Sequence, residues 1–213
     1  MVTTYSSRIL SIAFILVVSA NLIAQQQSNG STLLSINQDR LKDTRSAMLV
    51  LGSWAVGNIA VGLIGMSSTN NPETKAFHQM NAGWGAVNLT LAGFGYYSAA
   101  HADPSSFDLA QTSEELHKMQ KILLFNAGLD LAYMAGGLWM LEKSNNSTTN
   151  PEQWSGFGKS LLMQGAFLMV FDLGTAWALS KHHDKIRPLI KTSAPMGFQS
   201  SFTPELGVCI KLR

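Results

Sequence analysis

Four segments of about 20 mainly apolar residues restrict the fold of this chain more than any other feature. They cover residues 47–66, 77–99, 122–141 and 161–179. A helix of this length spans the hydrocarbon core of a bilayer, and the first two segments contain no Asp, Glu, Lys or Arg. The pattern predicts an all-α polytopic membrane protein, an antiparallel bundle of four transmembrane helices that follows an N-terminal signal segment.

The N-terminus has the pattern of a secretory signal. Arg8 precedes an apolar run over residues 9–18, and small residues around Ala20 and Ala24 suit cleavage by signal peptidase. We therefore interpret residues 1–24 as a signal peptide. The alternative is a retained signal anchor, which would add a fifth span.

The rest of the chain divides by composition. Residues 25–40 are rich in Gln, Ser and Asn and are predicted to form a flexible linker. The helical domain then covers residues 41–183, and residues 184–213 form a basic tail with a short hairpin possible in its second half.

The basic residues conflict with the signal peptide over orientation. Most Lys and Arg residues lie in the N-terminal linker, the second loop and the tail, a side that the positive-inside rule places in the cytoplasm. A cleaved signal peptide would instead place the linker outside. The orientation stays open.

Polar residues recur along each predicted span at spacings of three, four or seven, which place them on one helical face. They are Asn58 on the first span, His78, Asn81 and Asn88 on the second, Asn126, Asp130 and Tyr133 on the third, and Gln164 and Asp172 on the fourth. An unpaired polar group in hydrocarbon costs several kcal/mol. We therefore expect these faces to meet inside the bundle.

Asp130 and Asp172 are the most informative of these residues. In an antiparallel bundle both lie roughly 10–12 Å from the same membrane face, at 1.5 Å per residue. Ionisable groups at such depth often mark proton, cation or ligand sites. The structural alternative is a hydrogen-bonded pair that joins two helices. Both interpretations stay open, because no span contains a Lys or Arg that would neutralise either carboxyl.

The other polar residues of the spans favour structural roles. We interpret Asn58, Asn88, Asn126 and Gln164 as sources of hydrogen bonds between helices, and His78, at the end of a span, as a polar anchor. Small residues at four-residue spacing should let helix backbones approach closely. Two such stripes are Gly57, Val61 and Gly65, and Gly128, Ala132 and Gly136.

The sequence lacks the motifs of several chemistries. There is no HExxH, no GxSxG and no glycine-rich phosphate loop. The single cysteine, Cys209, forms neither an internal disulfide nor a cysteine-based zinc site. The net charge of +2, without a basic run among aromatics, argues against a nucleic-acid partner. We predict no catalytic residue, no metal and no cofactor.

Three stretches of the chain carry a family resemblance: residues 51–58, the segment from Phe77 to Asn88, and residues 121–130. Through them the chain resembles, from about Asn37 to His183, a bacterial family of uncharacterised small four-helix membrane proteins. It implies a multi-pass protein of the bacterial cell (inner) membrane and no particular reaction. It also directs attention to the matching residues His78, Asn81, Asn88, Asn126 and Asp130.

Three functional hypotheses follow. The first is a non-enzymatic binding or accessory protein whose partners are the lipid bilayer and a second copy of itself (a homo-oligomer) or a membrane partner protein. The second is a small proton- or cation-coupled transporter that uses Asp130 and Asp172. The third is an intramembrane enzyme with His78 as its acid or base.

Overall fold

The computed structural model describes the backbone of residues 3–193 and the side chains of residues 27–191. Four long helices make up almost all of this part, which is therefore all-helical, as predicted. They are α1 (Thr3–Ser68), α2 (Pro72–His101), α3 (Leu109–Asn146) and α4 (Pro151–Ser193), with a short 3-10 helix, η1 (Pro104–Ser106), between α2 and α3.

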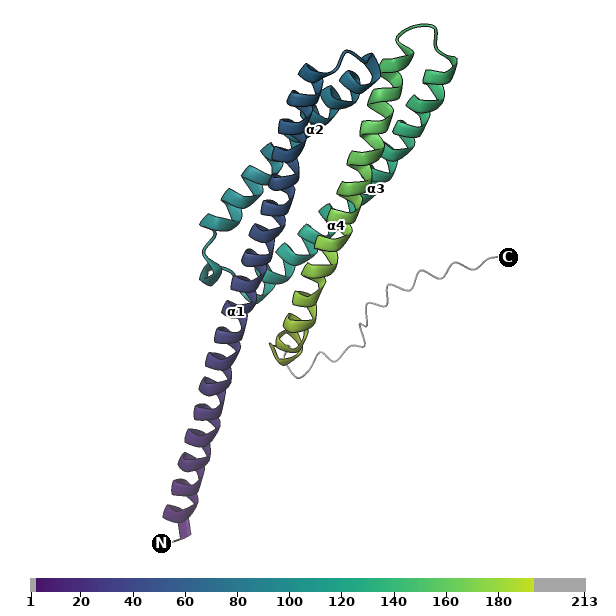
Figure 1. The fold of residues 1–213 in the computed structure, drawn as a ribbon. Coiled ribbons are helices and arrows are strands. Elements are labelled where there is room, and N and C mark those ends of the chain that lie inside the picture. The colour runs from purple at the N-terminus through teal and green to yellow at the C-terminus, as the bar shows by residue number, and fades with distance from the viewer. Residues whose placement is uncertain (1–2, 194–213) are drawn as a thin grey trace, which may run out of the picture.

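The helices form two antiparallel hairpins (Figure 1). Helix α1 packs along α2, and α3 packs along α4; the hairpins meet mainly between α2 and α4, with fewer contacts between α1 and α4. The α1–α2 and α3–α4 connections lie at one end of the bundle, which we call the hairpin end. The opposite end, which contains η1 and the C-terminal part of α4, we call the η1 end.

Local sequence explains where α2 and α3 begin. The side chain of Asn71 accepts a hydrogen bond from the backbone N–H of Thr74, and Pro72 occupies the first turn of α2, where its missing N–H costs nothing. Asp108 and Gln111 form a reciprocal capping box at the start of α3. These caps fix the chain reversals on which the hairpins depend.

Glycines set the distance between the helices of each hairpin. A Cβ atom on Gly85 of α2 would lie 2.8 Å from the carbonyl oxygen of Ala55 on α1. Likewise, a Cβ atom on Gly137 of α3 would lie 2.8 Å from the carbonyl oxygen of Gly158 on α4. Such distances exclude a larger residue without movement of the backbone, so both hairpins use close backbone packing.

The predicted small-residue stripes are only partly involved in this packing. Gly65 lies against the ring of His78, and Gly136 contacts a leucine of α4. Gly57 and Gly128 instead are exposed, with no heavy atom of another element within 4 Å of a Cβ built on them. For these two glycines the prediction of close packing is wrong, because their faces of α1 and α3 point away from the bundle.

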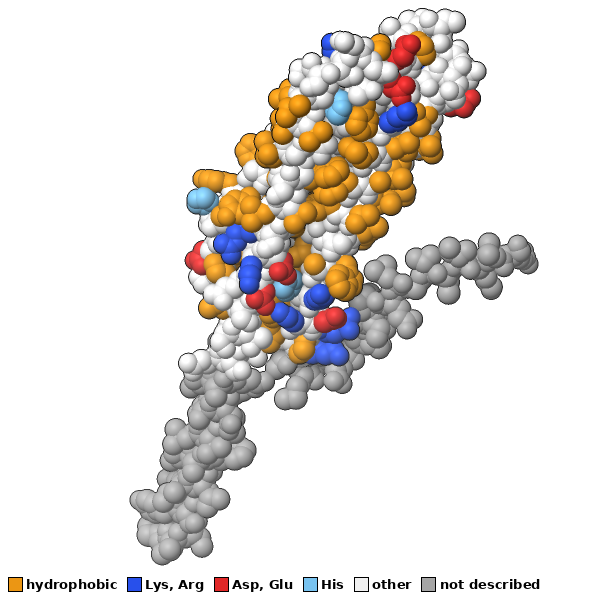
Figure 2. All heavy atoms as spheres, in the orientation of Figure 1, with side chains coloured by type: hydrophobic (Ala, Val, Ile, Leu, Met, Phe, Trp, Pro, Cys, Tyr) orange, Lys and Arg blue, Asp and Glu red, His pale blue; other side chains and the backbone are white. Residues whose placement is uncertain are grey.

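Three helices are long and apolar enough to cross a membrane. In the described part of the chain these are Gln27–Ser68, Leu109–Asn146 and Pro151–Lys191. Helix α2 falls outside this set, since its Gly, Asn, Trp and Tyr residues lower its hydropathy. Figure 2 shows hydrophobic side chains over the middle of the visible face, with charged side chains gathered towards its two ends.

The structure differs from the prediction of a flexible linker over residues 25–40, which lie within α1. Ile36 is 1% exposed and packs in an apolar cluster with Leu116 and Ile186. The neighbouring Asn37 donates a hydrogen bond to the hydroxyl of Thr112 on α3, at 3.0 Å. Contacts with distant helices therefore stabilise a helix that local composition does not favour.

The predicted basic tail is also partly helical, because α4 continues to Ser193. The hairpin predicted in the second half of residues 184–213 lies outside the described residues. The signal peptide predicted for residues 1–24 stays a prediction; α1 includes the backbone of residues 3–24.

Candidate ligand site in the polar core

Gln164 on α4 is the centre of a buried hydrogen-bond network. Its Nε2 donates to Oδ1 of Asn58 on α1 at 2.7 Å and to Oδ1 of Asn81 on α2 at 3.0 Å. Its Oε1 accepts from Nε1 of Trp54 on α1 at 3.0 Å. Gln164 is 1% exposed, so one side chain joins three helices in the interior of the bundle.

Two further bonds complete this network. The hydroxyl of Ser160, one turn before Gln164, donates to Oδ1 of Asn81 at 2.6 Å. Nδ2 of Asn58 donates to the backbone carbonyl of Trp54 at 2.8 Å. The donors and acceptors of this network therefore satisfy one another, as expected of hydrogen bonds that join helices in a structural role.

Asp130 on α3 and Asp172 on α4 form a second polar layer, closer to the η1 end. They are 2% and 6% exposed, and their carboxyl groups lie within hydrogen-bonding reach of each other. A hydrogen bond between two carboxyls needs a proton on one of them, because an ionised carboxylate only accepts. The structure thus brings together the two acids that the sequence places at the same depth.

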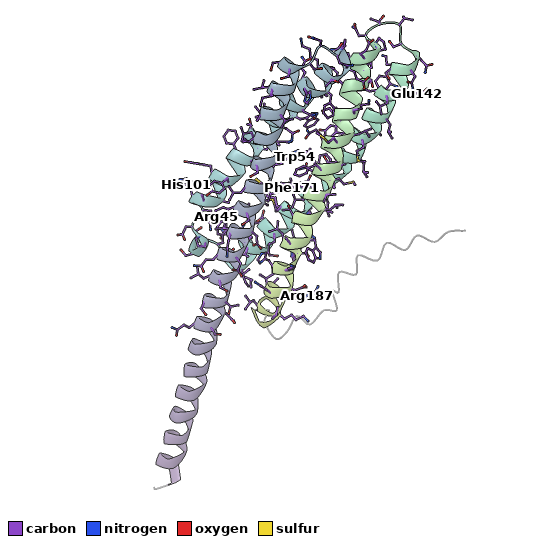
Figure 3. All side chains as sticks on the ribbon, viewed as in Figure 1. Arg45, Trp54, His101, Glu142, Phe171 and Arg187 are labelled. Carbon is purple, nitrogen blue, oxygen red and sulfur yellow. The ribbon has the colours of Figure 1, made fainter. Side chains whose placement is uncertain are left out.

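A cavity of about 160 Å³ adjoins the carboxyl pair and is lined by all four helices. Its polar lining consists of Asn88, Asn126, Asp130, Tyr133 and Asp172. Its apolar lining consists of Leu51, Trp84, Val87, Leu91, Leu129, Leu168 and Phe171. Phe171, like Trp54, lies in the middle of the bundle, between the charged residues labelled towards its two ends (Figure 3).

Two polar atoms at this cavity have no hydrogen-bond partner among the described residues. They are Nδ2 of Asn88, whose residue is 2% exposed, and Oδ2 of Asp130, which belongs to the carboxyl pair. An unsatisfied buried donor or acceptor costs about 1–3 kcal/mol. The unpaired amide of Asn88 offers a donor beside the cavity and the carboxyl pair offers acceptors, which favours a polar occupant.

An aromatic contact forms part of the cavity wall, one turn closer to the hairpin end than Val87 and Leu129. The rings of Trp84 on α2 and Tyr133 on α3 meet edge to face, with centroids 4.9 Å apart. Both residues line the cavity. This contact connects α2 to α3, which otherwise do not pack extensively.

The remaining candidate residue, His78, lies apart from the carboxyl pair. Its ring packs against Gly65 and meets the ring of Phe77 at 5.4 Å between centroids. It lies roughly 15 Å along α2 from Asn88, at 1.5 Å per residue. The structure therefore places His78 near the hairpin end, outside the cavity.

A cluster of buried polar residues at the η1 end was not predicted. Arg40 is 7% exposed and lies over the ring of Phe107, with its Cζ 4.7 Å from the ring centroid. His182 is 3% exposed, and its Nε2 lies 2.9 Å from Oδ2 of Asp43. Sequence reasoning did not predict that they are buried, because they lie beyond the apolar segments. Ser160 was also missed, although its four-residue spacing from Gln164 is a helical signal.

The surroundings of two titratable groups at the η1 end lower their pKa values. The ammonium of Lys185, 2.8 Å from Oδ2 of Asp39, lowers the pKa of that carboxyl through a hydrogen bond and charge attraction. Burial lowers the pKa of the Arg40 guanidinium. Within the described residues, no group of three or more His, Cys, Asp or Glu side chains is placed to hold a metal ion.

Comparison with known proteins gives a family but no activity. No curated protein and no solved structure matches the chain significantly. A family model matches residues 50–173, a range that contains the Gln164 network, His78 and the carboxyl pair. On this match, the chain belongs to the family of unknown function DUF6992.

Proposed function

We propose that this protein is a multi-pass membrane protein of the bacterial inner membrane that binds a small polar ligand in its core without converting it chemically. The observation that carries the proposal is the cavity beside the carboxyl pair of Asp130 and Asp172, with the unpaired amide donor of Asn88 in its lining. Carboxyls, amides and a phenol recognise charge and hydrogen bonds.

The surface supports membrane insertion of all four helices. Residues 46–68 of α1 and 76–101 of α2 contain no Asp, Glu, Lys or Arg. Residues 122–141 of α3 and 160–180 of α4 contain only the two buried aspartates. Large apolar side chains face outward, among them Phe94 on α2 at 74%, Phe125 on α3 at 68% and Val170 on α4 at 69% exposed. Such a surface favours lipid over water. Because α2 packs along α1, we propose that it crosses with α1 despite its lower hydropathy.

Cysteine labelling tests the four crossings. In a Cys209→Ser background, a membrane-impermeant maleimide should reach Asn70→Cys and Thr148→Cys from one side and Ser105→Cys only from the other. Labelling of Asn70→Cys and Ser105→Cys from the same side would show that α2 does not cross. The positive-inside rule favours the η1 end in the cytoplasm, since most Lys and Arg residues lie there.

Native mass spectrometry tests the binding site. The full chain, released from a mild detergent, should carry a small-molecule adduct. An Asp130→Asn/Asp172→Asn double variant should lose it, because the amides keep the shape of the pair and remove its charge. Asp184→Asn, an exposed change on α4, should retain the adduct. A bare wild-type protein, or equal adducts on wild type and double variant, would contradict the proposal.

Proton- or cation-coupled transport is the second candidate. It is favoured by the two carboxyls in hydrogen-bonding reach, and by a cavity that no Lys or Arg of the described chain lines. Such a pair can exchange a proton for a cation. In proteoliposomes, Asp130→Asn should abolish proton or cation flux while the protein stays folded. Unchanged flux in that variant would exclude this mechanism.

A further inference from the structure

The cavity beside the carboxyl pair reaches the surface between α2 and α3. Three of its apolar lining residues are also exposed: Val87 at 52% and Leu91 at 58% on α2, and Leu129 at 38% on α3. A residue that lines the cavity and also faces outward marks its mouth. The mouth lies where the two hairpins do not pack closely, because α2 and α3 are not among the helix pairs in extensive contact.

The depth of this mouth determines which phase it faces. The nearest charged residue before Asp130 on α3 is Lys121, and the two are about 13 Å apart along the helix axis. The hydrocarbon core is about 30 Å thick. If the four helices cross the bilayer as proposed, the mouth opens towards lipid tails. A ligand that arrives this way carries an apolar part.

The inner part of the cavity determines the chemistry of the head group. Its volume of about 160 Å³ is close to that of a cavity that holds benzene, so about six non-hydrogen atoms fit. No Lys or Arg among the described residues lines it, and a pair of carboxyls that shares one proton keeps a negative charge. A buried charge without a partner is costly. The head group should therefore be a cation.

The positions of Asp130 and Asn88 in the lining restrict the chemistry of the head group further. The Asp130 carboxyl, which lines the cavity and keeps negative charge, accepts from an ammonium N–H, and the unpaired Nδ2 of Asn88 needs an acceptor, which a hydroxyl oxygen supplies. We infer that the site takes a long-chain amino alcohol that enters from the bilayer between α2 and α3, with its ammonium at Asp130, its hydroxyl at Asn88 and its chain leaving past Val87 and Leu91. This inference rests on the proposed function and adds the class of ligand and its route.

Photoaffinity labelling tests the inference in the full-length protein, reconstituted in phosphatidylcholine nanodiscs. The probe is N-dodecylethanolamine with a diazirine on its chain, and the labelled peptides are mapped. We expect labels on the α2 and α3 peptides that contain Val87, Leu91 and Leu129. Unlabelled N-dodecylethanolamine should compete. Ethylene glycol monododecyl ether, in which oxygen replaces the charged nitrogen, should compete at least tenfold less well, since a charge-assisted hydrogen bond is lost.

Matched variants separate the mouth from the head-group site. Val87→Trp should block the mouth and reduce labelling about tenfold or more, as expected when the bound chain is displaced. Leu129→Trp gives an independent test from the other side of the mouth. Val170→Trp, an equally large change on an exposed face of α4 that does not line the cavity, should leave labelling unchanged. Asp130→Asn/Asp172→Asn should lose labelling with the mouth intact.

The outcomes distinguish this inference from the proposed function. If ethanolamine alone binds, as seen by native mass spectrometry, and its binding depends on Asp130 and Asp172 but not on Val87→Trp, a binding site exists but the amphiphile and its route are wrong. If the charged and uncharged competitors act equally, and the Asp130→Asn/Asp172→Asn variant is labelled like wild type, both the inference and the proposed binding site are wrong.

Discussion

Gly165 on α4 lies directly against the backbone of Asp130 on α3. A Cβ atom built on Gly165 would be 2.8 Å from the carbonyl oxygen of Asp130 and 2.7 Å from the side chain of Met134. Asp172 lies two turns further along α4, on the same face as Gly165. The close approach at this glycine therefore determines whether the two carboxyls meet.

Replacing this glycine should separate the helices of the second hairpin. We expect Gly165→Ala to lower the free energy of unfolding by about 1–3 kcal/mol, because a methyl group is forced against a backbone carbonyl. Gly174→Ala is the matched control on the same helix, since a Cβ there meets nothing within 4 Å. The free energy of unfolding of Gly174→Ala should rise by up to about 1 kcal/mol, because Ala has a higher helix propensity than Gly. Unfolding in mixed detergent micelles measures the stability of both variants. If the two are equally stable, the steric argument is wrong.

Gln164 should contribute more to stability than any other amide of the core. Gln164→Leu removes three bonds that join α4 to α1 and α2, each worth about 0.6–1.7 kcal/mol in a membrane. We therefore expect a loss of about 2–4 kcal/mol in the free energy of unfolding. Gln79→Leu, an exposed change on α2, should stay within about 0.5 kcal/mol of wild type. A Gln164→Leu variant as stable as Gln79→Leu would show that the network is dispensable.

The sequence predicted which polar residues face inward but not how they pair. Helical spacing and depth suffice to place Asp130 near Asp172, because both depend only on position along a straight helix. The pairing of Gln164 with Asn58 and Asn81 depends on how the helices rotate about their axes. Close backbone contacts at particular glycines set that rotation, and the sequence alone does not show which glycines make them.

The sequence also set the boundaries of the bundle too narrowly. Apolar segments report the part of a helix that contacts lipid, whereas the η1 end is held by contacts between distant parts of the chain. Local composition predicts that Asn37 and Arg40 belong to a linker, yet both are buried against other elements. Such burial is a property of the assembled fold, which local composition does not encode.

The N-terminal extension of the bundle makes a testable contribution to stability. Ile36 is 1% exposed and packs against Leu116 and Ile186, so Ile36→Ala should cost about 2–4 kcal/mol. Leu34, two residues earlier on the same helix, is 37% exposed, and Leu34→Ala should cost less than about 1 kcal/mol. Unfolding in detergent micelles, with proteolysis within residues 25–40 as a second measurement, compares the two. Equal effects would mean that this part of α1 does not pack as described.

His183, near the end of α4, should make stability depend on pH. Its ring meets the ring of His117 on α3 edge to face, with centroids 4.5 Å apart, and its Nε2 is buried without a partner among the described residues. Burial lowers the pKa of His183, and the nearby charge of His117 lowers it further. Asp184 opposes this shift, while His182 and Arg187 reinforce it.

The sign of the effect follows from proton linkage. Between the folded pKa of His183 and its unfolded value near 6.5, the unfolded chain binds more protons than the folded one, so stability rises with pH. The contribution of neutral His183 is present above the unfolded pKa and is lost as the pH falls through the folded pKa. His183→Gln should therefore reduce the loss of melting temperature between about pH 7.5 and about pH 5. The control His101→Gln, at the exposed end of α2, should leave this loss of melting temperature unchanged. If the loss in His183→Gln equals that of wild type, protonation of the buried His183 ring does not destabilise the fold.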